Sequence, residues 1–236
     1  MKKRLKKVLI VIFILVLLLA GGFYVYVSDY YRADATTLTI LEKKDSVQLK
    51  DNHILLSPSV PSDTALIFYP GAKVEYQAYL PLLQAISQTS NINVILVKMP
   101  FNLAIFDSGA ADNIMKQYPA IRNWFIGGHS LGGAMASDYA SKHADKIRGL
   151  ILLGAYPNGS YPIADTLTVY GTFNTSVAEK VNYTENVVVI QGGNHAQFGN
   201  YGKQKGDPDA TITSLEQQTI TTEAVKEFLL KRQNAK

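Results

Sequence analysis

One serine in a glycine-rich turn is the residue of this chain whose setting most clearly predicts chemistry. Residues 127–133 read GGHSLGG and directly follow the apolar run 124–126. The pattern G-x-S-x-G between a strand and a helix is typical of a nucleophile elbow, which exposes the serine hydroxyl on a sharp turn. Gly128 and Gly132 suit that turn because only glycine tolerates such close backbone approach at little cost. We therefore predict Ser130 as a nucleophile; the alternative is a serine that only caps a helix.

A base must take the proton of a serine hydroxyl before it becomes a good nucleophile. The chain has four histidines, of which His195 follows the last predicted strand within the sequence QGGNH. It also comes after Ser130, the chain order expected with this motif. We predict His53 in a hairpin turn, His129 with its side chain directed away from the reaction, and His143 at a helix end. The sequence thus predicts His195 as the general base, unless it is an ordinary loop histidine.

A third group must orient the imidazole of the base and stabilise its cation. The position expected for a carboxylate, after the strand between the serine and the histidine, carries Asn174. An amide can orient a histidine but supplies no negative charge, and Asp→Asn costs about 10⁴ in turnover in a trypsin-like triad. Three interpretations stay open. Asn174 orients the base weakly, another carboxylate (Asp165, Glu179 or Asp207) reaches it, or the chain has lost most of its catalysis.

Two backbone amides are predicted to stabilise a developing oxyanion. The first is the N–H of Leu131, directly after the serine. The second is the N–H of Ala72, in the loop PGAKV after an early strand, where Gly71 permits close approach. A plain strand-to-helix turn is the alternative. Gly71 is also expected to contact the substrate. Met99 and Phe101, which follow the next predicted strand, are expected to form a substrate wall, although core packing would explain them as well.

Elements of alternating type must position these residues. Continuous apolar runs predict strands at 65–69, 93–97, 122–126, 147–153, 167–170 and 187–190, and helical spacing predicts helices at 76–88, 107–118, 131–143 and 214–231. Residues 36–41 and 46–56 are expected as antiparallel strands, with a hairpin turn at 50–53. The fold class is therefore α/β, a mainly parallel sheet with helices on both faces. About a dozen residues separate 153 from 167, too few for a lid, so we expect an open, shallow pocket.

Four segments resemble the α/β-hydrolase superfamily, and more closely its compact, dienelactone-hydrolase-related branch of serine hydrolases. They are FYPGA at 68–72, KMPFNLA at 98–104, the elbow at 127–133 and GGNHAQFGNYG at 192–202. The resemblance implies an α/β-hydrolase sheet, Ser130 as nucleophile and His195 as base. It also implies an aspartate where Asn174 stands, and there the chain departs from the pattern.

The first residues predict a membrane anchor. Residues 1–7 read MKKRLKK, and residues 8–27 carry no charge. A run of this length is long enough to span a bilayer as a helix, and the preceding cations predict a cytoplasmic N-terminus. We expect a signal anchor at 8–27, a linker at 28–35 and one hydrolase domain at 36–236, extracytoplasmic at the cell membrane. A cleaved signal peptide is the alternative.

Charge and composition exclude several classes of function. The chain has 23 Lys and Arg and 19 Asp and Glu; five of the cations precede residue 8, which leaves 18 cations against 19 acids. Without a basic surface, nucleic acid is not an expected partner. Cysteine is absent, which excludes disulfides, thiolate metal sites and cysteine nucleophiles. No metal or nucleotide motif is apparent, so we expect no metal and no cofactor.

These residues together predict a membrane-anchored serine hydrolase of esterase type. Its substrate would be a small acyl compound, a carboxylic ester or thioester, cleaved through an acyl-enzyme. The open pocket also suits a bond on a large, surface-bound substrate. A hydrolase-like binding domain without catalysis and an acyltransferase with the same nucleophile remain alternatives.

Overall fold

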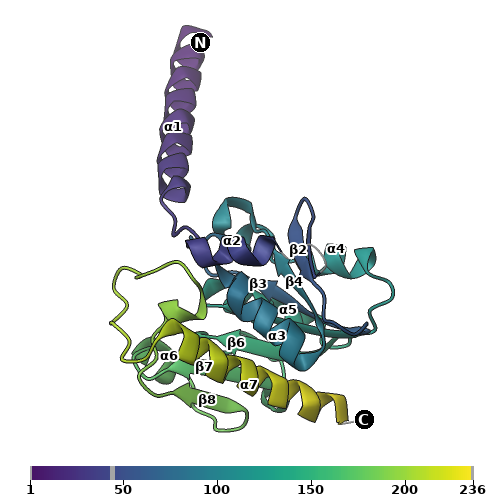
Figure 1. The fold of residues 1–236 in the computed structure, drawn as a ribbon. Helices are drawn as coiled ribbons and strands as arrows, with labels where there is room; N and C mark the ends of the chain where they lie inside the picture. The colour runs from purple at the N-terminus through teal and green to yellow at the C-terminus, as the bar shows by residue number, and fades with distance from the viewer. Residues whose placement is uncertain (1, 43–45, 235–236) are drawn as a thin grey trace. The chain divides into compact units, whose positions relative to one another are not determined.

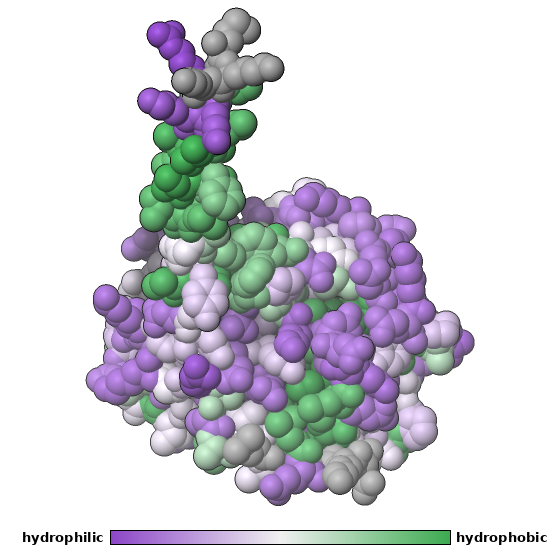
Figure 2. Space-filling view, turned by 90° about the horizontal axis from the view of Figure 1, so that it is seen from above, coloured by the Kyte–Doolittle hydropathy of each residue, from purple (hydrophilic) through white to green (hydrophobic). Residues whose placement is uncertain are grey.

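The computed structural model describes residues 2–42 and 46–234. They form two compact units, Met1–Tyr30 and Tyr31–Lys236. The first unit consists of the helix α1 (Lys2–Ser28), whose side chains are exposed along most of its length. Figure 2 shows its hydrophobic sides in green and the basic side chains near its beginning in purple. Its stretch Arg4–Ser28 is, in the described residues, the one helix long and apolar enough to cross a membrane.

The second unit is built on one sheet of eight strands, in the order β1-β2-β4-β3-β5-β6-β7-β8. β1 pairs antiparallel with β2, and β2 antiparallel with β4, whereas all other neighbours are parallel. The predicted mainly parallel sheet is therefore confirmed. The strands are β1 (Val47–Leu49), β2 (His53–Leu56), β3 (Thr64–Tyr69), β4 (Asn93–Val97), β5 (Asn123–His129), β6 (Ile147–Leu153), β7 (Thr166–Gly171) and β8 (Val187–Ile190).

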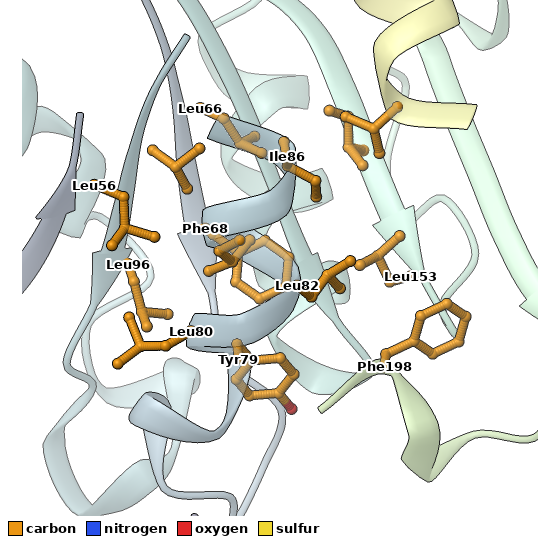
Figure 3. Packing of buried hydrophobic residues seen from close by; sticks show 14 of the residues in the cluster. Leu56, Leu66, Phe68, Tyr79, Leu80, Leu82, Ile86, Leu96, Leu153 and Phe198 are labelled. Atoms are coloured by element: carbon orange, nitrogen blue, oxygen red, sulfur yellow. The ribbon is translucent and has the colours of Figure 1, made fainter. Parts of the chain in front are cut away.

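Helices cover both faces of this sheet, again as predicted. They are α2 (Ala35–Leu41), α3 (Leu80–Ser90), α4 (Ala110–Gln117), α5 (Leu131–Lys142), the four-residue α6 (Thr175–Ala178) and α7 (Ser214–Asn234). α3 and α7 lie side by side on one face (Figure 1), and α4 and α5 cover the other. Successive residues of a strand point to opposite faces, so Phe68 packs under α3 while Ile67 packs with the α5 side chains. Figure 3 shows the cluster under α3.

The prediction for residues 36–41 was wrong, because they form the helix α2 instead of a strand. The side chain of Asp34 caps this helix by accepting a hydrogen bond of 2.9 Å from the N–H of Thr36. Ile40 and Leu41 pack against the large core cluster. A good cap and a tertiary contact here outweigh the β-branched composition that favoured a strand. The predicted hairpin at 46–56 is present as β1 and β2.

No helical lid interrupts the sheet where related folds could insert one. The connection between β6 and β7 is described throughout, and its only helical turn is the short 3-10 helix η4 (Ile163–Asp165). The carboxyl ends of the central parallel strands are therefore left open above the sheet, which is where ligands bind in open α/β sheets.

Candidate active site

Ser130 stands at the sharp corner between β5 and α5, in a strained backbone conformation. Its φ of 52° and ψ of −123° are unusual for a residue with a side chain. Such a conformation costs on the order of 1–3 kcal/mol and persists only where the surroundings hold it. The N–H of Ser130 donates to the carbonyl of Leu153 at the end of β6, with a distance of 3.0 Å. The corner is therefore fixed to the neighbouring strand.

Two glycines allow this corner to pack tightly against the loop after β3. A Cβ on Gly132 would overlap the carbonyl oxygens of Tyr69 and Pro70. A Cβ on Gly128 would lie only 2.5 Å from the carbonyl carbon of Gly132. The first turn of α5 therefore lies directly against the residues that precede Ala72.

The two amides predicted as oxyanion donors are free to bind a ligand. Among the described residues, neither Ala72 nor Leu131 uses its N–H in a hydrogen bond to another group of the chain. Leu131 begins α5, where helix geometry leaves the first N–H groups without an intrahelical partner. A helix N-terminus also carries a partial positive charge, which favours an anion at this point.

His195 shares two cavities with Ser130. One cavity of about 480 Å³ is lined by both residues together with Asn174, Thr175, Gln204, Lys205 and Asp207, among others. The other, of about 510 Å³, is lined by both together with Leu131, Ala134, Ala155, Tyr156 and Val177, among others. Burial lowers the pKa of His195 below its ordinary value, although the Asp207 carboxylate acts in the opposite direction. The imidazole is therefore kept in its neutral form, the form that can accept a proton.

Asn174 lies beside the ring of His195. Its side chain is buried, and its Nδ2 is 2.7 Å from Nδ1 of His195. Its Oδ1 accepts a hydrogen bond of 3.1 Å from the hydroxyl of Ser176. An amide nitrogen can only donate, so this orientation requires an unprotonated Nδ1 and puts the imidazole proton on Nε2. Rotating the amide would present Oδ1 to Nδ1–H and Nδ2 to the Ser176 hydroxyl.

The three alternative carboxylates lie in different places. Asp165 forms a salt bridge of 2.7 Å with Arg232. Glu179 follows α6 and lines neither cavity. Asp207 lines the first cavity, and its carboxylate accepts hydrogen bonds from the N–H of His195 at 3.1 Å and of Ala196 at 2.8 Å. Asp207 thus holds the backbone of the histidine, whereas Asn174 contacts its ring.

A buried relay joins the loop of the candidate oxyanion donor to the loop of the base. The N–H of Gly71 donates to the hydroxyl of Tyr79 at 3.0 Å, and that hydroxyl donates to Nδ1 of His129 at 2.8 Å. Nε2–H of His129 then donates to the carbonyl of His195 at 3.0 Å. Burial holds the pKa of His129 well below its ordinary range, so its ring stays neutral. Figure 3 shows Tyr79 with its hydroxyl directed away from the aliphatic side chains.

The sequence did not indicate Tyr79, Ser176 or Gly154. Gly154 follows β6 with a φ of +52°, and a Cβ there would lie 3.0 Å from Nδ1 of His195 and 3.3 Å from Nδ2 of Asn174. Gly154 therefore packs closely against the imidazole of His195 and the amide of Asn174, where a side chain would be crowded. A glycine at the end of a predicted strand was the available signal for Gly154, whereas Tyr79 and Ser176 have no recognisable spacing from the motif.

The predicted substrate wall is not part of either cavity. Met99 is 3% exposed and packs in the core with the α5 side chains. Phe101 is 53% exposed and lines neither of the two cavities that contain Ser130. Gly71 is buried and lines neither cavity, and its N–H donates to the hydroxyl of Tyr79. A metal site is also not apparent, since no group of three His, Asp or Glu side chains converges among the described residues.

Solved structures share this fold at low sequence identity. The Francisella virulence factor BioJ gives a TM-score of 0.57 at 15% identity, covering 83% of this chain and 90% of that chain. A putative lipase from Acinetobacter baumannii gives a TM-score of 0.58 at 12% identity, and the match covers 86% of this chain and 98% of the lipase. A dienelactone hydrolase from Anabaena variabilis gives a TM-score of 0.51 at 15% identity, and the match covers 76% of this chain and 90% of the dienelactone hydrolase. None of the curated proteins compared with this chain matches it.

A sequence family described as the alpha/beta hydrolase family matches residues 65–219. The match runs from β3 into α7 and so includes the elbow, the loop of Asn174 and the loop of His195. It covers well over half of the chain, and the sheet order and the open carboxyl edge agree with it. The chain belongs to the alpha/beta hydrolase family.

Proposed function

We propose that this chain is a membrane-anchored serine hydrolase of esterase type, which cleaves a carboxylic ester or thioester through an acyl-enzyme. The observation that carries the proposal is the strained conformation of Ser130, at the corner that opens α5, in cavities shared with His195. Strain at a single residue is most informative where chemistry needs that residue exposed. A putative lipase and an esterase/lipase from an uncultured bacterium are among the solved structures that share this fold, which agrees with this class of reaction.

The first half of the reaction transfers the acyl group to the enzyme. The Ser130 hydroxyl oxygen attacks the carbonyl carbon, while Nε2 of His195 accepts the hydroxyl proton. The carbonyl oxygen becomes an anion that the N–H groups of Leu131 and Ala72 stabilise. The bond to the leaving oxygen or sulfur then breaks, and the leaving group takes the proton from His195.

The second half releases the acid. His195 accepts a proton from water, whose oxygen attacks the acyl-enzyme carbonyl at the same pair of amides. The bond to Ser130 breaks, and the serine oxygen recovers its proton from the imidazole. The open cavities, without a lid, give water access to this intermediate, which favours hydrolysis.

The orientation of Asn174 decides how fast this sequence can run. Nε2 of His195 accepts the serine proton only when Nδ1 carries the ring proton. The productive arrangement is therefore the one with Oδ1 of Asn174 facing Nδ1–H and Nδ2 donating to Ser176. The opposite arrangement, with Nδ2 facing Nδ1, blocks the base, and an amide cannot exclude it as a carboxylate can.

Membrane anchoring rests on α1. At 1.5 Å per residue, the 25 residues of Arg4–Ser28 extend about 38 Å, and the 20 uncharged residues 8–27 within them extend about 30 Å, the thickness of the hydrocarbon core of a bilayer. The cations before residue 8 favour a cytoplasmic N-terminus and therefore a hydrolase domain on the opposite side of the membrane. A signal sequence removed on export is the competing interpretation of the same helix.

A binding domain without catalysis is the second candidate function. The close approach of Asn174 Nδ2 to His195 Nδ1 favours it, because this arrangement leaves the base protonated on the wrong nitrogen. Such a protein would retain the two cavities and bind an acyl compound without turning it over.

Fluorophosphonate labelling separates the two functions. The full chain in detergent micelles is treated with a fluorophosphonate probe beside Ser130→Ala, with circular dichroism as a check of folding. We expect labelling of the native chain only, followed by hydrolysis of a short-chain aryl ester at a rate that the variant lacks. A folded native chain that takes up no label and cleaves no ester would overturn the hydrolase proposal and favour the binding domain.

A further inference from the structure

Three large apolar side chains gather on the surface at the edge of the sheet where the active site lies. Phe101, Ile105 and Phe106 are 53%, 51% and 49% exposed. They lie on the 3-10 helices η2 (Pro100–Asn102) and η3 (Ala104–Phe106), just after the carboxyl end of β4. The rings of Phe101 and Phe106 contact each other edge to face at 5.6 Å. We call these three residues the apolar rim.

The backbone that carries this rim is strained. Phe101 has a φ of 55° and a ψ of 21°, and Asn102 also has a φ of 55°. A bulky aromatic residue in the left-handed region is a genuine outlier, and glycine would fit the turn with less strain. Strain of this kind concentrates at sites that bind or catalyse. The exposed position of Phe101 therefore calls for a functional reason.

Hydrogen bonds connect the rim to the point where the chain enters the second unit. The N–H of Tyr31 donates to the carbonyl of Lys73 at 2.7 Å, and the N–H of Lys73 donates to the carbonyl of Asn102 at 2.8 Å. Tyr31 also forms a parallel bridge with Val74. The entry point, the loop that contains Ala72, and the rim are therefore neighbours in one corner of the domain.

Chain connectivity places this corner near any membrane that α1 spans. α1 ends at Ser28, and only residues 29 and 30 separate it from Tyr31. Three Cα–Cα steps extend at most about 11 Å. When α1 crosses a bilayer, Tyr31 is held within that distance of Ser28, and the rim adjoins Tyr31 through the hydrogen bonds of Lys73 and Asn102. The exposed Lys98, three residues before Phe101, adds a cation suited to lipid phosphates.

We propose that the apolar rim inserts into the leaflet in which α1 ends, and that the site takes its ester or thioester from amphiphiles in that leaflet. This rests on the proposed function and adds the substrate class to it. The two cavities that meet at Ser130 suit an amphiphile. One is lined by Ala134, Ala155 and Val177 and fits an acyl chain, and the other is lined by Thr175, Gln204 and Lys205 and fits a polar head.

Quenching by brominated lipids tests the insertion without requiring activity. Ile105→Trp and Leu230→Trp are matched variants, because both replace an aliphatic residue that is 51% exposed. Leu230 lines a cavity with Thr64 and Asn123, which begin β3 and β5, so it lies at the opposite edge of the sheet. Each full-length variant is reconstituted into phosphatidylcholine vesicles with and without bromine on the acyl chains. The buried Trp124, present in all chains, gives the baseline.

We expect bromine to quench the added fluorescence of Ile105→Trp strongly and that of Leu230→Trp no more than the baseline. Equal quenching of the two variants, whether strong or absent, would overturn docking through the rim. Phe106→Trp carries the same test should Ile105→Trp fail to fold. Recovery of the chain from vesicles in soluble form would overturn the membrane anchor itself.

A ratio of activities tests the substrate class. The double variant I105S/F106S is compared with L230S on a long-chain aryl ester dissolved in vesicles and on a short-chain aryl ester in water. We expect the ratio of the two rates to fall at least about tenfold in the double variant, because two apolar side chains no longer enter the lipid. An unchanged ratio would contradict the substrate class. Rim quenching in a chain that takes up no fluorophosphonate would instead overturn the hydrolase function and leave the docking intact.

Discussion

Asn174 is the residue at which this chain departs from the usual chemistry of its family. The amide reaches the ring of His195, but it can present either a donor or an acceptor to Nδ1. A carboxylate in the same place would accept from Nδ1–H only. Ser176 takes part in the choice, because its hydroxyl contacts the other end of the amide and can serve either as donor or as acceptor.

Replacing Asn174 with aspartate should therefore increase the turnover of a short-chain ester. The carboxylate fixes the proton on Nδ1 and stabilises the imidazolium, a difference worth up to about 10⁴ in a trypsin-like triad. Its negative charge also raises the pKa of His195, so the acidic limb of the kcat/KM profile should move to higher pH. Steady-state kinetics between pH 4 and pH 8, on the order of one point per half unit, measure both effects.

Two further variants control this experiment. Asn174→Ala removes the contact with the ring altogether, and it should not exceed the native rate. Ser176→Ala removes the hydroxyl that holds the amide in either orientation, so it should change the native rate more than the rate of the aspartate variant. A folded Asn174→Asp chain with unchanged kinetics would show that the amide does not support the base, and attention would turn to Asp207.

The element that presents Ser130 is α5, and its position depends on Gly132. A Cβ at this residue would meet two carbonyl oxygens of the loop after β3, which are backbone atoms and cannot rotate away. Gly132→Ala should therefore push that loop and Ala72 away from the corner. Overpacking of this kind costs about 1–3 kcal/mol of stability. A displacement of about 1 Å at a reacting group costs on the order of 100-fold in rate.

Gly109→Ala is the matched control for this prediction. Gly109 precedes α4 with a φ of −87°, and a Cβ there would meet nothing within 4 Å. The control should keep native ester hydrolysis and a native thermal midpoint, whereas Gly132→Ala loses activity by a larger factor than its stability explains. Equal kinetics of the two variants would argue against the tight corner.

The sequence predicted best those elements whose burial produces a simple pattern of apolar residues. The parallel strands β4 and β6 lie at the predicted residues because strands covered on both faces are apolar without interruption. α2 was missed because its side chains are β-branched and its stability comes from the cap at Asp34 and from packing on the core. Neither contribution is visible in a short run of residues.

The candidate site likewise contains residues that a local sequence pattern predicts and residues that only the fold brings together. Ser130 and Leu131 follow from a local motif, and His195 follows from its place after the last strand. The relay through Tyr79 joins residues from three separate elements, so no spacing in the sequence reports it. Met99 and Phe101 were proposed as a wall from their place after β4, but one side chain turned inward and the other outward. Successive side chains of a strand point to alternate faces, whereas the directions of side chains in a loop follow no fixed period.

At the scale of the whole molecule, buried neutral histidines make the stability of the fold depend on pH. Burial lowers the pKa of His53, His129 and His195 below 6.5. His53 lies between the Asn52 side chain and the hydroxyl of Tyr118, far from the site. In the unfolded chain these groups return to about 6.5 and take up protons below that pH. The unfolded state then binds more protons than the folded state, so stability rises with pH and falls as the pH drops through 6.5.

The free energy of unfolding should therefore decrease below about pH 6.5, by about 1.4 kcal/mol per pH unit for each histidine that stays neutral in the fold. Lowered pKa values of the carboxyls, such as Asp63 and Asp112, act only nearer their ordinary value of 3.8. The interval between pH 6.5 and about 5 thus reports on the histidines. The fluorescence of Trp124, the single buried tryptophan, follows the unfolding of the domain in detergent micelles.

His129→Gln identifies the main contributor within that interval. The variant loses the relay and should be less stable at pH 7.5, but its unfolding free energy should fall with acid less steeply than that of the native chain. The expected difference in slope is about 1.4 kcal/mol per pH unit, the contribution of one proton. Parallel slopes would mean that His129 is protonated in the folded chain. Nδ1–H of His129 would then donate to the Tyr79 hydroxyl, and the relay would carry a positive charge next to His195.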